Sequence, residues 1–338
     1  MFFENPLQVD KYFIILIYPF QPFHYLQLTP KMLTMKVHTV YLLFLCCLLS
    51  KLSFAQDYFY NNHYYETDFL FEAGFSIGAI NCLTDIGGRP GNGKRFLKDL
   101  NWQNTKLSGG IFMGVTYRYA LSARLSFNLG NILASDSILK NDPTEARNRY
   151  RRNLHFKSGI TELILLAELH PLMFFPANNK ANIFSPYLVG GIGLFHFDPR
   201  ACLNGEWIAL NELHTEGQGF GEYPERKEYK LTQVSFPVGA GIKFECSALL
   251  NLRLEILHRI TRTDYLDDVS TRYIDPSLFQ KYLSPTRTSY ALQLNNRQKE
   301  LDPSVVTTSN AIRGNNSRND SYFTIQCKLS LIMGRERR

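Results

Sequence analysis

Three closely spaced aspartates are the residues of this sequence that most suggest chemistry. Asp264, Asp267 and Asp268 lie within the segment Thr263-Asp-Tyr-Leu-Asp-Asp-Val-Ser270. Oxygen-rich loops of this kind bind Ca²⁺ in many proteins. The spacing lacks the regular ligand positions and the central glycine of an EF-hand. We therefore favour a hydrogen-bonded cap at the end of the preceding strand over a calcium site.

No other motif predicts catalysis. The segment Gly88–Lys94 has the glycine and lysine spacing of a phosphate-binding loop, but Arg95 follows where that motif needs Ser or Thr to reach Mg²⁺. Pro90, with glycines around it, indicates a hairpin tip instead. The histidines have neither HxH nor HExxH spacing, and no GxSxG nucleophile motif occurs. We expect no catalytic residue, no cofactor and no metal, and we predict that the protein is not an enzyme.

A larger polar set consists of charged residues that alternate with apolar ones. In an eight-stranded barrel the interior is just wide enough for side chains to fill it. Opposite charges on neighbouring strands would therefore pair into a salt-bridged plug rather than line an open pore. The predicted lumen charge network contains Glu72, Arg118, Arg124, Glu162, Glu168, Lys243, Glu245, Arg253, Glu255, Arg259 and Lys328.

The elements that would position these charges are strands, because apolar and polar residues alternate with a period of two. Most segments alternate over nine to thirteen residues. A tilted strand that crosses a bilayer needs about 9–11 residues, whereas strands in soluble proteins average about five or six. The Gly-rich fifth segment leaves its two faces undetermined. The eight predicted strands are Asp68–Ala79, Leu107–Tyr119, Leu121–Gly130, Thr161–His170, Tyr187–Phe197, Gln233–Glu245, Asn251–Arg259 and Tyr322–Leu331.

The connections between these segments are alternately short and long. The long ones cover residues 80–106, 131–158, 198–231 and 260–321. In an up-and-down meander this pattern puts all long loops on one side, as in outer-membrane barrels, and a lipid-facing sheet must close. We predict an all-β fold, an eight-stranded antiparallel up-and-down transmembrane β-barrel with four long loops on one side. A secreted sandwich or a soluble lipocalin-like barrel, with the faces reversed, is the alternative.

Aromatic residues at the predicted strand ends suggest where an interface with lipid headgroups would lie. Tyr117, Tyr119, Tyr187, Phe195 and Phe197 are consistent with aromatic girdles.

The N-terminal region predicts export. Residues 35–55 have a short positive start, an apolar stretch and small residues before Gln56, as in a signal peptide. We interpret residues 1–34 as an upstream extension from an early start codon, residues 56–66 as a periplasmic N-terminal segment, and residues 67–334 as the barrel. Cys82, Cys202, Cys246 and Cys327 show no CxxC spacing, and a Cys82–Cys202 disulfide remains an alternative in an exported chain.

Composition limits the other classes. The chain has 338 residues, a formal net charge of +7 and 45% hydrophobic residues, which excludes a mainly disordered protein. No stretch after residue 55 approaches the roughly 20 apolar residues of a spanning helix. The basic residues are too dispersed to predict nucleic-acid binding.

Three segments carry a family resemblance: Asp85-Ile86-Gly87-Gly88, the strand Pro186–Gly193, and above all His258–Ser270. They resemble a family of small outer-membrane β-barrels of Bacteroidetes, mostly described as a domain of unknown function and similar to PorG, an accessory barrel of the type IX secretion system. The resemblance covers about residues 67–334. It implies location in the cell outer membrane, contact with outer-membrane lipid, and contact with periplasmic or outer-membrane secretion proteins. The family-like positions at the base of the last long loop are Thr263, Asp264, Tyr265, Asp267, Asp268 and Ser270.

These observations favour a non-enzymatic outer-membrane barrel with a structural or interaction role, as an accessory component of protein secretion or envelope assembly. The alternative is a narrow channel or a barrel that binds small solutes. Segment 260–321 is the best candidate for a partner-binding or lid segment, with short helices expected at Pro276–Leu283 and Tyr290–Leu301.

Overall fold

The computed structural model describes residues 68–88, 101–140, 146–174 and 184–334. The expected signal peptide at 35–55 and its flanking segments at 1–34 and 56–66 lie outside these residues. So does all of the phosphate-loop-like segment after Gly88.

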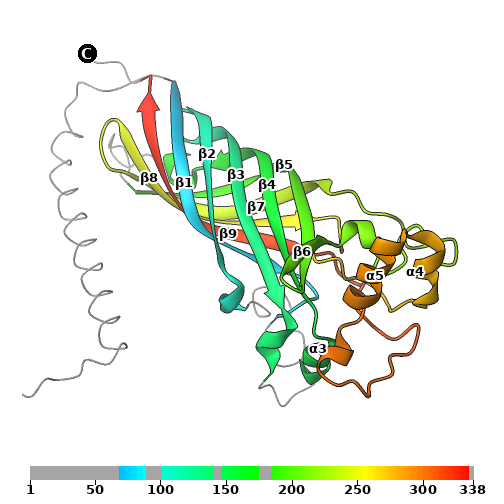
Figure 1. Cartoon of the computed structure of the whole chain (residues 1–338). Coiled ribbons are helices and arrows are strands. Elements are labelled where there is room, and N and C mark those ends of the chain that lie inside the picture. Colours follow the sequence, from blue (N-terminus) through cyan, green and yellow to red (C-terminus); the bar gives the residue numbers. More distant parts are fainter. Residues whose placement is uncertain (1–67, 89–100, 141–145, 175–183, 335–338) are drawn as a thin grey trace, which may run out of the picture. The chain divides into compact units, whose positions relative to one another are not determined.

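Eight long antiparallel strands form a closed barrel, which confirms the predicted fold (Figure 1). Each strand pairs with the next in the chain, β5 pairs directly with β7, and the last strand pairs with the first. A short extra strand, β6 (Glu206–Ala209), pairs only with the end of β5. The eight wall strands are β1 (Phe69–Leu83), β2 (Lys106–Tyr117), β3 (Leu121–Ser135), β4 (His155–Leu169), β5 (Phe184–Leu203), β7 (Thr232–Glu245), β8 (Leu250–Thr261) and β9 (Ser321–Met333).

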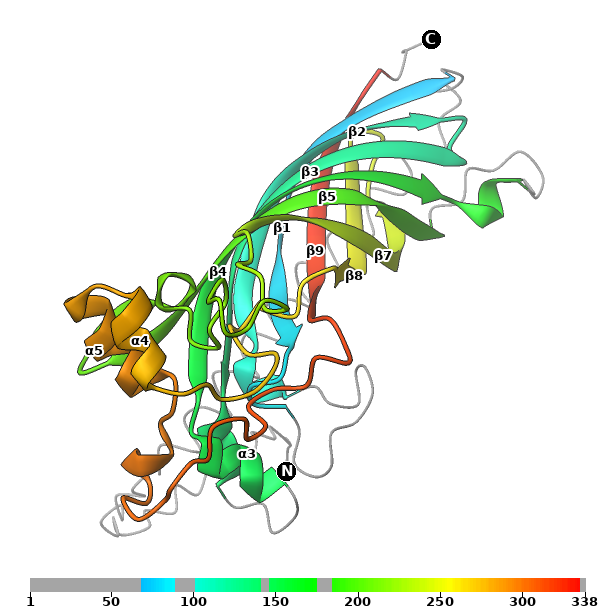
Figure 2. The ribbon, with the colours of Figure 1, turned by 90° about the vertical axis from the view of Figure 1, so that its right-hand side faces the viewer.

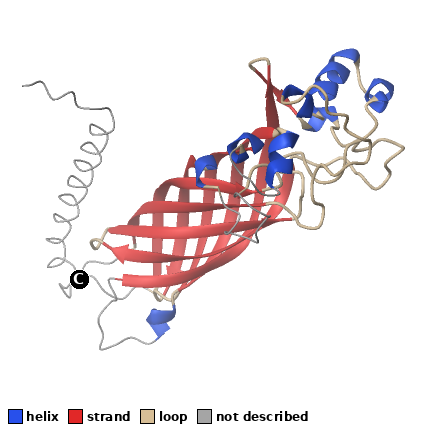
Figure 3. Cartoon of the chain, turned by 90° about the horizontal axis from the view of Figure 1, so that it is seen from below, coloured by secondary structure: helices blue, strands red, loops and turns tan. Residues whose placement is uncertain are grey.

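Short and long connections alternate as predicted. Residues 118–120, 170–183 and 246–249 join strands at one end of the barrel, and residues 84–105, 136–154, 204–231 and 262–320 join them at the other. We call the described residues of the four long connections the cap. The cap contains the helices α3 (Ala146–Arg152), α4 (Ser277–Tyr282) and α5 (Pro285–Leu294) (Figures 1 and 2). In Figure 3 most of the helical turns gather at this end of the strands.

The two predicted helices of the last connection are only partly correct. Helix α4 lies inside the first predicted range, Pro276–Leu283. Helix α5 covers Pro285–Leu294, whereas the predicted range was Tyr290–Leu301. The helix therefore begins five residues earlier and ends seven residues earlier than predicted. Proline fits the first turn of a helix, because an amide hydrogen there has no intrahelical partner.

The strand faces have the orientation expected of a lipid-facing barrel. Leu125 and Leu165 point outward and are 40% and 55% exposed, whereas their neighbours Arg124 and Ile164 are buried inside. The apolar side chains of a soluble sandwich or lipocalin-like barrel would point inward and its charges outward. That alternative is therefore wrong for this chain.

Above the level of Leu194 the two faces exchange their polarity. On β5, His196 and Arg200 are exposed on the outside, while Phe195 and Phe197 are fully buried inside. Buried Ile132 and Phe156 join them in a hydrophobic core that continues into the cap. The strands thus leave a charged interior and enter an apolar one as they approach the cap.

This reversal corrects part of the aromatic-girdle prediction. Phe195 and Phe197 stack on each other inside the barrel, with ring centroids 5.5 Å apart. Tyr187 is also buried. Alternation shows which side chains share a face, but it does not show where along the strand that face stops meeting lipid.

One predicted lumen residue lies elsewhere. Arg118 belongs to the β2–β3 turn, where its φ of 45° ends the alternation of β2. Its side chain is exposed and forms an ion pair with Asp68 at 2.8 Å. The prediction extended the strand by two residues too many.

Two further features concern cysteines and helices. The four described cysteines are free thiols, so Cys82 and Cys202 are not bridged. No helix among the described residues is long and apolar enough to cross a membrane.

Candidate functional site

The barrel interior contains a continuous network of paired charges centred on Glu168. Its carboxylate contacts Arg124 (Nη1 to Oε1, 2.8 Å) and Arg253 (Nη1 to Oε2, 2.7 Å). The His170 ring lies 3.6 Å from Oε2. All of these side chains are fully buried, so each charge must be compensated by its neighbours rather than by water.

The two arginines extend this network across the lumen. Arg124 Nη2 donates to Glu255 Oε2 at 2.5 Å, and Lys328 Nζ lies 2.9 Å from the other oxygen of Glu255. Arg253 also binds Glu72, which accepts a further hydrogen bond from Asn251 at 3.0 Å. Strands on opposite sides of the barrel are therefore linked through its interior.

A second cluster lies nearer the cap and is centred on Glu162. Arg259 Nη2 contacts Glu162 Oε1 at 2.5 Å, and the Tyr322 hydroxyl donates to Oε2 at 2.8 Å. Asn128 donates to the same carboxylate at 3.0 Å. This cluster lies directly below the apolar core of Phe195 and Phe197, since the Tyr322 ring is 5.6 Å from that of Phe195.

Ten of the eleven predicted lumen residues are buried in the barrel interior, five of them cations and five carboxylates. We call these ten residues the lumen network: Glu72, Arg124, Glu162, Glu168, Lys243, Glu245, Arg253, Glu255, Arg259 and Lys328. The exception is the exposed Arg118. The lumen network has equal numbers of the two signs, and most of its residues contact a residue of opposite sign.

Neutral partners of these charges were not found from the sequence. Tyr187 was assigned to the lipid interface, yet its hydroxyl donates to Glu255 at 2.9 Å. Gly241 provides the room, because a Cβ there would lie only 2.4 Å from the Tyr187 ring. A glycine on the inner face of a strand is a signal that could have indicated a large neighbouring side chain.

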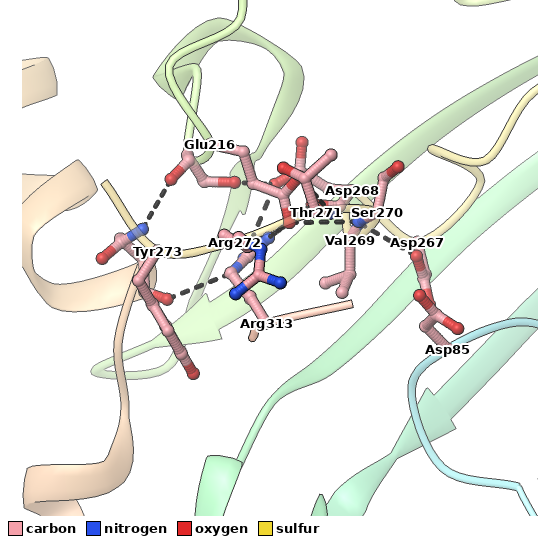
Figure 4. A network of polar contacts seen from close by, with 12 residues as sticks. Asp85, Glu216, Asp267, Asp268, Val269, Ser270, Thr271, Arg272, Tyr273 and Arg313 are labelled. Carbon is pink, nitrogen blue, oxygen red and sulfur yellow. Dashed lines mark hydrogen bonds and ion pairs between the residues drawn. The ribbon is translucent and has the colours of Figure 1, made fainter. Parts of the chain in front are cut away.

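At the other end of the barrel, the family-like segment 263–270 joins three cap connections (Figure 4). The carboxylate of Glu216 accepts hydrogen bonds from the amides of Ser270 (3.0 Å) and Thr271 (2.8 Å) and from Arg313 (2.9 Å). Asp267 Oδ2 accepts from the amide of Ile86 at 2.8 Å, so the first and last long connections are joined.

The remaining members of the segment also form structural contacts. Asp268, with a φ of 65°, accepts hydrogen bonds from the hydroxyls of Thr215 (2.5 Å) and Tyr229 (2.7 Å). Asp264 accepts from the Ser270 hydroxyl at 2.7 Å. Thr263 accepts from the amide of Tyr265 at 3.1 Å, whose ring stacks on that of Tyr229 with centroids 4.9 Å apart.

Several carboxyl groups of this junction lie close together and away from water. Burial and the carboxylates of Asp85 and Asp267 raise the pKa of Asp264 to about 8, although its hydrogen bond from Ser270 acts in the opposite direction. Burial and the same neighbouring carboxylates raise the pKa of Asp320 well above its usual range. Among the described residues, no group of three or more His, Cys, Asp or Glu side chains is arranged to hold a metal ion.

The sequence did not reveal the partners of this segment. Glu216, Asp85, Asp320 and Arg313 come from three separate stretches without periodicity, and Glu216 lies 54 residues before Ser270. The one available signal was the density of aspartates, which identified a structured loop base but not what it joins.

The sequence matches a known family over residues 67–276, described as Domain of unknown function (DUF6089). No curated protein matches it.

The barrel resembles small outer-membrane β-barrels. Neisserial surface protein A is 9% identical, with a TM-score of 0.35 over 78% of this chain and 97% of that chain. The N-terminal β-barrel domain of Pseudomonas aeruginosa OprF is 7% identical, with a TM-score of 0.31 over 79% and 98%. The outer membrane protein OprG from the same organism is 8% identical, with a TM-score of 0.31 over 78% and 95%.

Proposed function

The chain belongs to the DUF6089 family, and from that premise we propose that it is a non-enzymatic outer-membrane barrel whose closed wall anchors a folded interaction cap. The proposal extends to an accessory role in protein secretion or envelope assembly.

The observation that carries this proposal is the height of the apolar outer surface. On β5 the outward side chains from Phe184 to Leu194 are mostly apolar, with Leu188, Ile192 and Leu194 each more than half exposed. At about 3.3 Å per residue and a tilt of about 40°, this stretch is roughly 25 Å tall, which matches the apolar band of outer-membrane barrels. We call the outward apolar surface at this height the apolar band.

On β4 and β5, polar residues limit the apolar band on the cap side at the same level. His196 on β5 pairs with Thr161 on β4, and four residues nearer the cap Arg200 pairs with Lys157. Water can solvate these outward side chains, whereas lipid cannot. The polar and apolar faces of the strands change places at this level because the strands leave the bilayer there. Above that level the outer face meets water, and the inner face can form an ordinary hydrophobic core.

The lumen network favours an anchor over a channel. Arg124, Arg253 and Lys328 each contact a buried carboxylate, and none of the three is more than 2% exposed. A conducting lumen would need a continuous water path past these side chains. The narrow-channel alternative therefore has less support.

The cap has the features of an interaction module. Leu213, Phe279 and Leu294 of the cap are buried in the hydrophobic core that continues from the end of the barrel, so the cap is folded and has a defined surface. That surface exposes apolar side chains, among them Val306 (89%) and Ile312 (70%). Exposed apolar residues at a loop-rich end are typical of partner contacts.

Cross-linking in intact cells tests the interaction role. The tagged full chain is cross-linked, recovered from membranes and examined for co-purified secretion or envelope components. Val306→Lys should reduce recovery of the partner at least about fivefold, whereas Ser309→Lys, which adds the same charge at an exposed polar position nearby, should leave it unchanged. Recovery of the barrel alone, or equal recovery from both variants, would contradict the proposal.

A further inference from the structure

The cap contains a cavity of about 720 Å³ that the contacts described so far leave unexplained. Helix α3 forms one side of it, and residues 298–305 and 312–315 of the last long connection form the other. In Figure 1 these segments lie beside each other at the cap end of the molecule. A volume of this size is typical of sites for small organic ligands.

Two buried arginines with fixed positions line the cavity. Arg152 and Arg313 both line it, and both are almost fully buried. Arg152 donates to both carboxylate oxygens of Asp136, at 2.8 and 2.9 Å, and to the carbonyl of Arg313 at 2.6 Å. Arg313 is held in turn by Glu216 at 2.9 Å. These partners hold the two guanidinium groups in fixed positions.

Helix α3 adds two further cations at the mouth. Arg149 is half-buried and donates to the carbonyl of Gly87 at 2.8 Å. Arg151 is exposed and forms no ion pair within 4.0 Å among the described residues. The lining thus includes four arginines and two aspartates, Asp85 and Asp302. Asp136 and Glu216, which do not line the cavity, compensate the charges of Arg152 and Arg313.

The two aspartates of the lining already have donors of their own. Asp85 accepts from the amide of Asn315 at 2.5 Å, and Asp302 accepts from the amide and hydroxyl of Ser304 at 3.0 and 2.6 Å. The hydrogen bonds from Ser304 and the charge of Arg151 both lower the pKa of Asp302, so Arg151 already acts on one carboxylate at the mouth of the cavity without forming an ion pair with it.

Three apolar side chains lie on the opposite side of the cavity, among polar ones. Leu301, Val305 and Ile312 line it, and Leu301 and Ile312 are 43% and 70% exposed to water. Covering such side chains with an apolar group is favourable, by about 25 cal/mol for each Å² removed from water. A ligand that used the whole cavity would have a charged group toward the arginines and an apolar body toward these three residues.

We propose that this cavity is a binding site for a soluble organic anion, with a phosphate or carboxylate group held by the α3 arginines and an apolar body packed against Leu301, Val305 and Ile312. Guanidinium groups suit both anions because they donate two parallel hydrogen bonds. On β4, Leu163 lies at the edge of the apolar band and His155 lies close to α3 in the chain. At about 3.3 Å per residue and a tilt of about 40°, His155 is roughly 20 Å above the band. The choice of a soluble ligand over a lipid headgroup rests on the proposed function, because it assumes that lipid surrounds the apolar band. The anion site itself does not depend on that assumption.

Calorimetric titration of the full chain in neutral-detergent micelles tests the site, with phenyl phosphate as the probe. We expect saturable one-to-one binding, and weaker binding of inorganic phosphate because it cannot contact the apolar side chains. Arg151→Glu should weaken phenyl phosphate binding by about tenfold or more. The matched control is Arg318→Glu, an exposed charge reversal outside the cavity lining, which should change it less than about twofold.

Four results would overturn the proposal. Absence of saturable phenyl phosphate binding, or equal losses in Arg151→Glu and Arg318→Glu, would show that the cavity is not the site. Equal affinity for inorganic phosphate would show that the apolar side chains take no part. In nanodiscs, displacement of phenyl phosphate by phosphatidic acid but not by phosphatidylcholine would show that the anion is a lipid headgroup. Unchanged binding in both lipids supports a soluble ligand.

Discussion

Replacing Arg253 with Met should strongly destabilise the folded barrel. Its two Nη atoms bind Glu168 and Glu72, and all three side chains are buried. Removing one partner of a buried pair typically costs about 3–5 kcal/mol, because the remaining charge is left without compensation. Here each carboxylate keeps a second cation, since Glu168 still contacts Arg124 and Glu72 still lies 3.9 Å from Lys243. We therefore expect a value near the lower limit, about 3 kcal/mol.

The assay is equilibrium unfolding in urea in the presence of lipid vesicles, followed by the gel mobility of the folded barrel. The matched control is Arg118→Met, which breaks an arginine–carboxylate pair of similar length that is exposed to water. Water already solvates both groups of that pair, so its loss should leave the unfolding midpoint unchanged. Replacing Glu168 with Gln in the Arg253→Met background should restore part of the lost stability, because it removes one of the two carboxylates whose charge Arg253 balanced. Equal midpoints for the two arginine variants would refute the view that lumen charges stabilise the fold by mutual pairing.

Three further predictions concern the wall, the cap and the lumen. Gly241→Val should destabilise the barrel by about 2 kcal/mol or more, measured in the same urea assay, because a β-carbon at this position overlaps the Tyr187 ring, whereas Ala240→Val on the outward face should be tolerated. Asp264 has a pKa near 3.8 in the unfolded chain and about 8 when folded, so its stabilising effect is complete below the lower value and is lost as the pH rises through the upper one. The thermal unfolding temperature should therefore fall between pH 6.5 and pH 9, and it should fall less in Asp264→Asn; an equal fall in both proteins would exclude Asp264 as the cause. In planar bilayers the wild-type chain should give no single-channel steps, and regular steps would favour the channel alternative.

The strands could be predicted from the sequence because a period of two depends only on neighbouring residues. That same period assigned Arg124 and Glu168 to the inner face, where the structure has them. Arg118 was misplaced because a turn begins there, and nothing in the alternation marks its positive φ. Phe195 and Phe197 were misassigned for another reason. The Gly-rich segment left its two faces undetermined, and the surroundings of each face change along the strand, which alternation does not indicate.

The cap could not be predicted in the same way. Glu216 binds Ser270 and Thr271 across a long stretch of irregular chain. Such contacts follow from the tertiary fold and leave no periodic pattern. The sequence indicated that the segment around Asp267 was structured, but not that it joins the first long connection through Ile86.

Contact between detergent and individual methyl groups tests the central claim most directly. Ile164 and Leu165 are neighbours on β4, but Ile164 is fully buried inside the barrel and Leu165 is 55% exposed outside. In NMR spectra of the full chain in micelles, the methyl groups of Leu165 should show nuclear Overhauser effects to the detergent alkyl chains, and those of Ile164 should show none. Effects at Ile164 together with water contact at Leu165 would contradict the account, because lipid would then meet the face that holds the charges.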